Sequence, residues 1–473
     1  MKSRKIIFLT LLLYFSTNAY GQKVSQNKMV DDFNQLIAII NNYYSALPLV
    51  EQRTQTSISE QFKLLKKECY TLKTREEFGH LVNMTLNVLN DKHATVVNAG
   101  IVKMYLTQFS ELANLGNISL SDTLNADYFF KLKNNIMPKM KTGIRSKYID
   151  GHYYNARAFS YQGISFDLGD EIIEINGIPI SEYVDQNKYE LYNLTWDEKN
   201  KKWYSELFWL NKNIIDNDKF DLTICNKDIT LNCNKKVNLT QEIKQFSASP
   251  LVTNFDNILY IRMPIMFNGD WFSDQIVSNY NPDINRIIID IRGNRGGQDR
   301  AWKEVLSTII KQPIPLKSEI AINDNEAVKN ALHLYNLNSS QLIITDTIYP
   351  LDNSINFNDK IYILQDRDTY SAASSFTSIA FQSENIISVG YPISHIGGRG
   401  LTPLIFKLNK SGIVFRIPFT IDLSGGTANP YMNKVEIELQ QSIQDYLCMI
   451  NTNQYDIEFV KNKDLMIKYI RKQ

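Results

Sequence analysis

The chain has 473 residues, a formal net charge of +1 at pH 7, 44% hydrophobic residues and 21% charged residues. A globular chain of this length has room for two or three domains with sizeable cores. The nearly balanced charge favours neither nucleic acid nor an anionic membrane surface as a partner, so we expect no nucleic-acid binding.

The first residues have the pattern of a secretory signal peptide. Three basic residues precede an apolar run, Ile6 to Phe15, which is too short to span a bilayer comfortably. Ala19 and Gly21 then occupy the small-residue positions of a cleavage site. We therefore expect residues 1–21 to be removed, and the mature protein to be exported, periplasmic or extracellular, and not membrane-spanning.

Residues 22–100 are predicted to form an N-terminal helical domain. Apolar residues recur at helical spacing in three segments between residues 28 and 90. The second and third segments begin with capping boxes, at Ser57 and at Thr74. Residues 100–138 have no clear period and are expected to be irregular.

A histidine follows the third predicted helix, where Asp-Lys-His (91–93) leads into a short β-like segment. Taken alone, such a histidine is more often a partly buried structural residue than a functional one. The functional alternative is a general base, because imidazole titrates near neutral pH. The sequence around His93 leaves both interpretations open.

Residues 139–240 are predicted to form a β-rich domain. Asp150-Gly151 suits a hairpin turn, and the stretch from Leu168 to Ile180 combines a Gly-Asp turn, an alternating strand and an Asn-Gly type I′ turn. This stretch resembles the centre of a PDZ domain, which implies a module that captures extended peptides by strand addition. The alternative is a hairpin in another small barrel. Residues 234–256 then have the composition of a linker.

Residues 250–450 are predicted to form an α/β core around one buried strand. The run Ile-Ile-Ile-Asp-Ile (287–291) has no polar face to give to water, which is typical of a strand covered on both sides. The loop Arg-Gly-Asn-Arg-Gly-Gly (292–297) and a helix from Gln298 to Ile310 follow. Two adjacent glycines let backbone amides turn toward an anion, although a tight turn without a ligand is equally compatible with the sequence.

A second strand, Ile361–Leu364, is followed by Ser371, a helix and a third strand, Ile386–Gly390. This βαβ order predicts a sheet that is at least partly parallel. Ligand sites in such sheets lie beyond the carboxyl ends of the strands, where the glycine loop and Ser371 are both expected. Ser371 is either the N-cap of the helix or a nucleophile at its start.

Three motifs in this order resemble the C-terminal processing peptidases (tail-specific proteases). They are Asp-Ile-Arg-Gly-Asn-Arg-Gly-Gly (290–297), Thr-Tyr-Ser-Ala-Ala (369–373) and the Gly-Gly-Arg-Gly loop (397–400). With the PDZ-like segment upstream, the resemblance covers about residues 85 to 445. It implies an α/β catalytic core related to the crotonase type and an endopeptidase that cleaves unstructured proteins or peptides.

The resemblance also implies roles for individual residues. Ser371 is the expected nucleophile, and Gly296 or Gly297 with the amide of Ala372 would form the oxyanion hole. Arg292 would support the glycine loop.

The general base departs from the pattern of the best-known members, which use a lysine after the serine. The stretch 391–400 contains no lysine, and Arg399 cannot substitute because a guanidinium does not deprotonate near neutral pH. The tricorn-like branch instead uses an N-terminal histidine, which His93 resembles, so His93 is the expected base and His395 the runner-up. The late glutamate of that branch has no counterpart in Gly425–Asn433.

The sequence therefore predicts an exported serine endopeptidase with a His general base, a helical N-terminal domain, a PDZ-like domain and an α/β core. The alternative is a catalytically inactive family member that acts as a PDZ-type peptide-binding protein, because the family lysine and glutamate are missing. An acyl-CoA enzyme on a crotonase-like core is disfavoured, since export separates it from that cofactor. The four cysteines lack the spacing of a metal site, and no metal or other cofactor is expected. The oligomeric state stays open.

Overall fold

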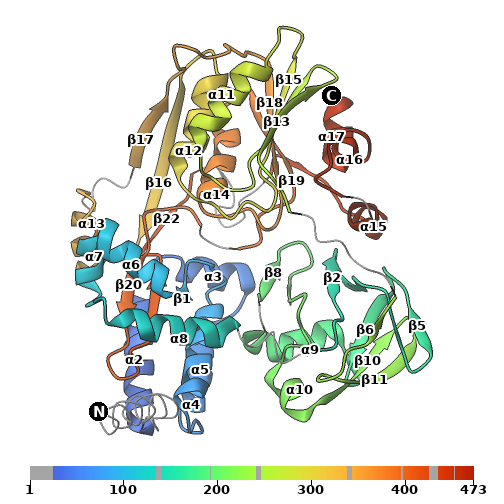
Figure 1. Ribbon diagram of the computed structural model, residues 1–473. Coiled ribbons are helices and arrows are strands. Elements are labelled where there is room, and N and C mark those ends of the chain that lie inside the picture. Colours follow the sequence, from blue (N-terminus) through green and yellow to red (C-terminus); the bar gives the residue numbers. More distant parts are fainter. Residues whose placement is uncertain are drawn as a thin grey trace, which may run out of the picture.

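The structure is a computed structural model that describes residues 25–134, 141–191, 193–240, 247–337, 343–395, 398–424, 435–451 and 453–473. The predicted signal peptide lies outside these ranges. In Figure 1 the N-terminal helices (blue to cyan), a β-rich region (green) and a sheet flanked by helices (yellow to red) occupy different parts of the molecule. Within the described ranges, no helix combines the length and the apolar character that a membrane span requires.

Helices dominate the chain before residue 134. They are α2 (Gln26–Tyr43), α3 (Leu47–Thr54), α4 (Ile58–Glu68), α5 (Arg75–Asn87), α6 (Ala99–Gln108), α7 (Ser110–Leu115) and α8 (Asp122–Asn134). The side chains of Ser57 and Thr74 accept hydrogen bonds from the backbone at the starts of α4 and α5, and the complete capping box forms at Thr74 with Glu77.

Two predictions for this region are wrong. The segment before residue 90 contains α3 as an additional short helix, which starts with a proline in its first turn. Residues 100–138, expected to be irregular, contain α6, α7 and α8. The helices α6 and α7 have only 10 and 6 residues, and in α6 only Val102 and Tyr105 are buried, so the sequence has too few apolar repeats to reveal these two helices.

The β-rich region contains two sheets and a separate hairpin. Its elements are β2 (Ser146–Ile149), β3 (His152–Asn155), β4 (Phe159–Tyr161), β5 (Ile164–Phe166), β6 (Glu171–Ile175), β7 (Ile178–Pro179), α9 (Ile180–Asn187), β8 (Thr195–Asp197), β9 (Lys202–Tyr204), α10 (Lys212–Asn217), β10 (Lys219–Ile224), β11 (Lys227–Asn232) and β12 (Asn238–Leu239). The larger sheet has the order β11-β10-β6-β3-β2, and β12-β4-β5 forms the smaller one. The predicted turns at Asp150-Gly151 and Asn176-Gly177 are confirmed, since all four residues have positive φ.

The α/β core is built on a sheet of order β13-β14-β15-β18-β19-β23. Its strands are β13 (Leu251–Phe255), β14 (Ile258–Arg262), β15 (Arg286–Asp290), β18 (Lys360–Gln365), β19 (Ile386–Gly390) and β23 (Ile437–Glu438). All neighbours are parallel except β13 and β14, so the predicted βαβ unit is confirmed. The predicted linker, residues 234–256, is shorter than expected, because β12 and β13 both lie within it.

Both faces of the sheet are covered, which explains the isoleucine-rich strand β15. Ile287 and Ile289 pack with α11 (Gly269–Asn279) and α12 (Asp299–Ile309) on one face. Ile288 packs on the other face with α17 (Leu465–Arg471) and α16 (Ile457–Asn462). Figure 1 shows these two helix layers on opposite sides of the sheet. A strand buried on both faces needs no polar alternation.

A further sheet joins a strand from the N-terminal part of the chain to two strands from the C-terminal part. The short strand β1 (Thr95–Val96) pairs antiparallel with β21 (Val414–Ile417), which pairs with β20 (Leu404–Lys407). The N-terminal helices pack on this sheet in one continuous apolar core that includes Phe415 and Ile405. The helices therefore share their core with residues from the C-terminal half. The remaining elements of the described ranges are β16 (Ile314–Ile322), α13 (Glu326–His333), β17 (Ile343–Ile348), α14 (Ala372–Thr377), β22 (Thr420–Asp422) and α15 (Ile443–Asn451), with short 3₁₀ turns at Lys188–Glu190 and Ser378–Gln382.

The contact between α7 and β20 gives a test of this shared core. A Cβ at Gly116, the residue after α7, would overlap the carbonyl oxygen of Ile405. We predict that Gly116→Ala lowers the free energy of unfolding by more than about 2 kcal/mol, because the backbone of β20 cannot yield as a flexible side chain can. Gly100→Ala, in α6, is the control and should change stability by less than about 1 kcal/mol. Equal effects in urea unfolding would contradict this account of the interface.

Candidate active site

The glycine loop after β15 is held close to the backbone that follows β14. The amide of Met266 donates to the carbonyl of Gly296 at 3.0 Å, and the amide of Gln298 donates to the carbonyl of Met266 at 2.8 Å. Gly296 and Gly297 have φ values of 101° and 145°, which glycine adopts without a Cβ penalty. A Cβ at Gly297 would overlap the Met266 carbonyl. Both glycines are therefore required by backbone geometry.

Ser371 lies directly against this loop with a strained backbone. Its φ and ψ are 58° and −130°, a region that L-residues rarely adopt outside functional sites. A Cβ at Gly296 would stand 2.5 Å from the Ser371 Cβ and 3.0 Å from its Oγ. Ser371 occupies the N-cap position of α14, as predicted, but its side chain makes no capping hydrogen bond to the helix. The meeting of Ser371 with the glycine loop is as predicted.

The backbone amides around Ser371 differ in their availability. The amide of Gly296 donates to Asn294 Oδ1 at 2.8 Å, so it is not free for an anion. Asn294 is fully buried and also donates to the carbonyl of Met263 at 2.8 Å. Among the residues that the structure describes, the amides of Gly297 and Ala372 have no hydrogen-bond acceptor. The sequence analysis did not predict a role for Asn294. Its position inside the glycine loop was the only indication that the sequence offered.

His93 lies beside the residue that precedes Ser371. Its amide donates to Asp91 Oδ1 at 2.8 Å and to the Tyr370 hydroxyl at 3.2 Å. The His93 and Tyr370 rings meet edge to face, with centroids 4.9 Å apart. His395 lies near the same tyrosine, with centroids 6.2 Å apart. The structure thus brings both predicted histidines to Tyr370, with His93 closer.

Burial, and then nearby positive charge, disfavour protonation of the two histidines. Burial, and then the charge of Arg416 on β21, lower the pKa of His93 well below its ordinary value. Burial, and then Lys92 and Arg53, likewise lower the pKa of His395. Both imidazoles are therefore neutral near pH 7 and can accept a proton. Arg416 was not anticipated, because it is far from His93 in the sequence and reaches it through the pairing of β1 with β21.

Asp91 is the buried carboxylate of this arrangement. Its Oδ1 accepts from the Tyr370 hydroxyl at 2.5 Å, and its Oδ2 accepts from the Tyr44 hydroxyl at 3.2 Å. Burial raises the pKa of Asp91 to about 6, against the opposing effect of these hydrogen bonds. The carboxylate holds the backbone of His93, not its ring. The sequence placed Asp91 near His93 and Tyr370 within the motif of Ser371, but it gave no signal that these residues meet, and none for Tyr44.

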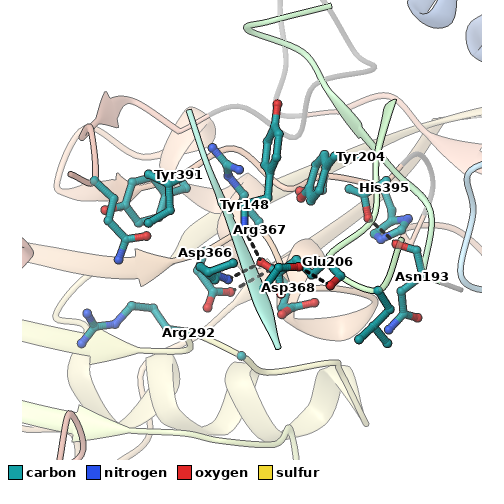
Figure 2. A pocket seen from close by; sticks show the side chains of 18 of the residues that line it. Tyr148, Asn193, Tyr204, Glu206, Arg292, Asp366, Arg367, Asp368, Tyr391 and His395 are labelled. Carbon is teal, nitrogen blue, oxygen red and sulfur yellow. Dashed lines mark hydrogen bonds and ion pairs between the residues drawn. The ribbon is translucent and has the colours of Figure 1, made fainter. Parts of the chain in front are cut away.

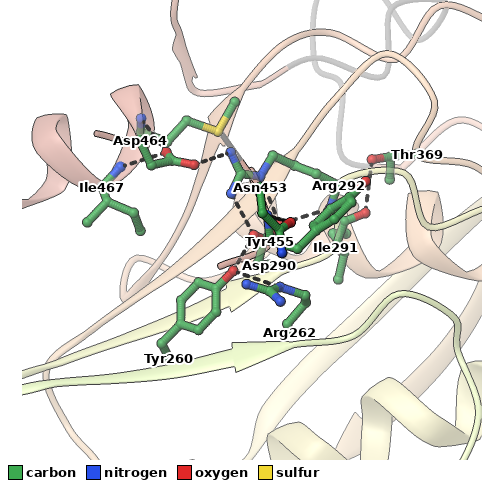
Figure 3. A network of polar contacts seen from close by, with 11 residues as sticks. Tyr260, Arg262, Asp290, Ile291, Arg292, Thr369, Asn453, Tyr455, Asp464 and Ile467 are labelled. Atoms are coloured by element: carbon green, nitrogen blue, oxygen red, sulfur yellow. Dashed lines mark hydrogen bonds and ion pairs between the residues drawn. The ribbon is translucent and has the colours of Figure 1, made fainter. Parts of the chain in front are cut away.

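Arg292 is the first residue of the glycine loop, and its side chain anchors the loop. Its guanidinium donates to Asp290 Oδ1 and Oδ2 at 2.9 and 2.6 Å, and to Asp464 Oδ2 at 2.7 Å. Asp464 also caps α17, and the Tyr260 hydroxyl donates to Asp290 at 2.6 Å (Figure 3). Burial raises the pKa of Asp290, but the charge and hydrogen bonds of Arg292 outweigh it and hold this pKa below its usual value. Arg292 thus ties the loop to the C-terminal helices.

A cleft of about 1290 Å³ opens beside these residues. Its lining comes from the N-terminal helices, the β-rich region and the α/β core, and includes His93, Tyr370 and His395. Figure 2 shows Tyr148 and Tyr204 of the β-rich region facing Arg367 of the core. The volume of the cleft exceeds that of ordinary small-molecule pockets, which are about 300–1,000 Å³. Within the described ranges, no group of three or more His, Cys, Asp or Glu side chains is placed to hold a metal ion.

The strain at Ser371 predicts an unusual stability effect. We expect Ser371→Gly to raise the free energy of unfolding by about 1 kcal/mol, because glycine adopts this backbone conformation without strain and no capping bond is lost. Ser375→Gly, the same change within α14, should lower it by about 0.5–1 kcal/mol. Urea unfolding of both variants measures the difference. Destabilisation by Ser371→Gly would show that the residue is not strained.

The part of the chain that carries the glycine loop and Ser371 matches a known protein family. Residues 257–427 match Peptidase family S41. Mature CPAF is similar in fold, with 12% identity, a TM-score of 0.55, and coverage of 93% of this chain and 99% of that chain. Mature CPAF complexed with lactacystin gives 14% identity, a TM-score of 0.56, and coverage of 95% and 99%.

The photosystem II D1 C-terminal processing protease gives 12% identity, a TM-score of 0.39, and coverage of 91% of this chain and 99% of that chain. A search of curated proteins finds no match to the sequence.

Proposed function

We propose, from the premise that residues 257–427 form a peptidase family S41 domain, that this protein is a serine endopeptidase of the C-terminal processing type. The match to this family supports a peptidase that acts on proteins or peptides. In the proposal Ser371 is the nucleophile and His93 the general base. The observation that carries it is the strained Ser371, which lies against the glycine loop and next to the tyrosine that contacts His93.

The proposed reaction proceeds through an acyl-enzyme. Ser371 Oγ attacks the carbonyl carbon of the scissile peptide bond while its proton passes to the neutral imidazole of His93. The amides of Gly297 and Ala372 donate hydrogen bonds to the carbonyl oxygen, on which negative charge develops. The protonated His93 then gives its proton to the leaving amine, and a water molecule, activated by the same imidazole, hydrolyses the ester.

The charge beside His93 distinguishes this site from a triad with a carboxylate. The charge that acts on the imidazole is that of Arg416, which disfavours the protonated ring. The ring is consequently a weaker base but a stronger acid toward the leaving amine. The segment Gly425–Asn433, where a related enzyme carries its glutamate, lies outside the described residues.

We also propose that the protein acts after export and that the β-rich region works as a PDZ-like module beside a crotonase-type core. The amino-terminal sequence pattern supports export. The Asn176-Gly177 hairpin, followed directly by α9, supports the PDZ-like proposal. The inactive peptide-binding protein is the competing function. We favour the enzyme because a strained serine without a capping role is costly to keep in a scaffold.

Substitution of the two proposed residues tests the enzyme. Ser371→Ala should lower hydrolysis of an unfolded protein such as casein by at least about 1000-fold, because the nucleophile is removed. His93→Gln should cause a loss of similar size, and the double variant should be hardly worse than either single variant, since the two groups act as one unit. His333→Gln, at an exposed position in α13, is the control and should be fully active.

Two results would change the assignment. Full activity in Ser371→Ala would exclude the serine mechanism. An active His93→Gln together with an inactive His395→Gln would transfer the base to His395.

The pH dependence tests whether His93 titrates in the reaction. Because burial and Arg416 lower its pKa below 6.5, kcat/KM should rise with pH through an apparent pKa below that value and be level at neutral pH. Arg416→Gln should move the apparent pKa of kcat/KM to higher pH, because the charge that lowers the pKa of His93 is removed. Asp91 titrates in the same range, with a pKa of about 6, and Asp91→Asn separates the two groups. If the apparent pKa of kcat/KM lies above 7 and does not change in Arg416→Gln, His93 is excluded as the base.

A further inference from the structure

Tyr370 connects every part of the candidate site. Its amide donates to the carbonyl of Asn294 in the glycine loop at 3.0 Å. Its hydroxyl donates to Asp91 at 2.5 Å and accepts from the His93 amide at 3.2 Å. Its ring meets the His93 ring, and it is covalently joined to Ser371. The side chain is 3% exposed, so water does not compete for these bonds.

Asp91 completes the connection from the other side. Its Oδ1 accepts from both the His93 amide and the Tyr370 hydroxyl. The three groups form a closed set of hydrogen bonds in a buried place, where each bond is stronger than in water. A closed set of this kind allows little relative movement between the segment that carries His93 and the segment that carries Ser371.

We propose that Tyr370 and Asp91 are a positioning pair that fixes His93 relative to Ser371. The inference rests on the proposed function, because it concerns the same nucleophile and base. Neither residue touches the reacting atoms. Tyr370 acts because it is adjacent to Ser371 in the chain and bonded to the histidine segment in space, while Asp91 supplies the shared acceptor. A shift of about 1 Å between two reacting groups can cost about 100-fold in rate.

A purely structural role is the alternative, in which Asp91 only needs hydrogen-bond donors to be tolerated in the core. Tyr44 distinguishes the two roles, because its hydroxyl donates to the same carboxylate at 3.2 Å from the opposite side. Tyr44 lies just after α2 and has no chain connection to Ser371. A structural role predicts similar effects when either hydroxyl is removed. A positioning role predicts a catalytic effect for Tyr370 alone.

The test compares Tyr370→Phe with Tyr44→Phe in the full-length mature chain. Tyr370→Phe keeps the ring contact with His93 and removes only the hydroxyl. We expect its kcat to fall about 10- to 100-fold with KM within about twofold of the wild type, because alignment is lost while binding is not. Tyr44→Phe should keep kcat within about threefold. Equal losses of kcat in the two variants, or a loss confined to KM, would overturn the proposal.

Conservative replacement of Asp91 provides a second comparison. Asparagine keeps an acceptor oxygen for the His93 amide and the Tyr370 hydroxyl, whereas alanine removes it. Asp91→Asn should therefore retain at least about ten times the kcat of Asp91→Ala, with both proteins folded. Equal kcat values in the two variants would contradict positioning through this acceptor.

A readout independent of turnover separates this inference from the proposed function. The chain has five histidines, so the His93 ring can be followed by NMR of histidine-labelled protein and assigned with His93→Gln. We expect its resonance to shift and broaden in Tyr370→Phe and to stay unchanged in Tyr44→Phe. If this pattern holds while Ser371→Ala is as active as the wild type, positioning stands and the serine mechanism fails. If hydrolysis depends on Ser371 but the His93 resonance is the same in the wild type, Tyr370→Phe and Tyr44→Phe, the positioning proposal fails and the serine mechanism stands.

Discussion

The antiparallel pairing of β1 with β21 is the contact on which the candidate site depends. Thr95 lies opposite Arg416 and Val96 opposite Phe415, so His93 enters the core only because a late strand receives it. The pairing closes a very long loop, but the entropy of loop closure grows slowly with length. Burial of the N-terminal helices against β20 and β21 in one apolar core offsets that cost.

Strain at Ser371 is maintained by rigid surroundings on several sides. Gly296 lies against its side chain, and a Cβ at Gly398 would stand 2.8 Å from the Tyr370 ring and 3.1 Å from the Ser371 amide. The glycine loop is in turn fixed by Asn294 and by the Arg292 ion pairs with Asp290 and Asp464. A residue in a rare conformation persists only when its neighbours determine it this strongly.

The contacts around the cleft join all three regions of the chain. Arg53 of α3 is 5% exposed and donates to Glu198 of the β-rich region at 3.1 Å and to the carbonyl of Ser394 at 3.0 Å. Ser394 immediately precedes His395. A buried charge of this kind is tolerated because it is paired and hydrogen-bonded, and losing one partner is costly. The β-rich region is therefore attached to the loops that surround the cleft.

The sequence by itself determined the parts that rest on local chemistry. Isoleucine runs gave β15 and its burial, capping residues gave α4 and α5, and Asn-Gly and Asp-Gly gave the hairpin turns, because each depends on neighbours in the chain. Only the tertiary structure decided that Ser371 is strained against Gly296, that His93 lies against Tyr370, and that the charge of Arg416 acts on the His93 ring. These features depend on contacts between residues that are far apart in the sequence, and no local pattern encodes such contacts.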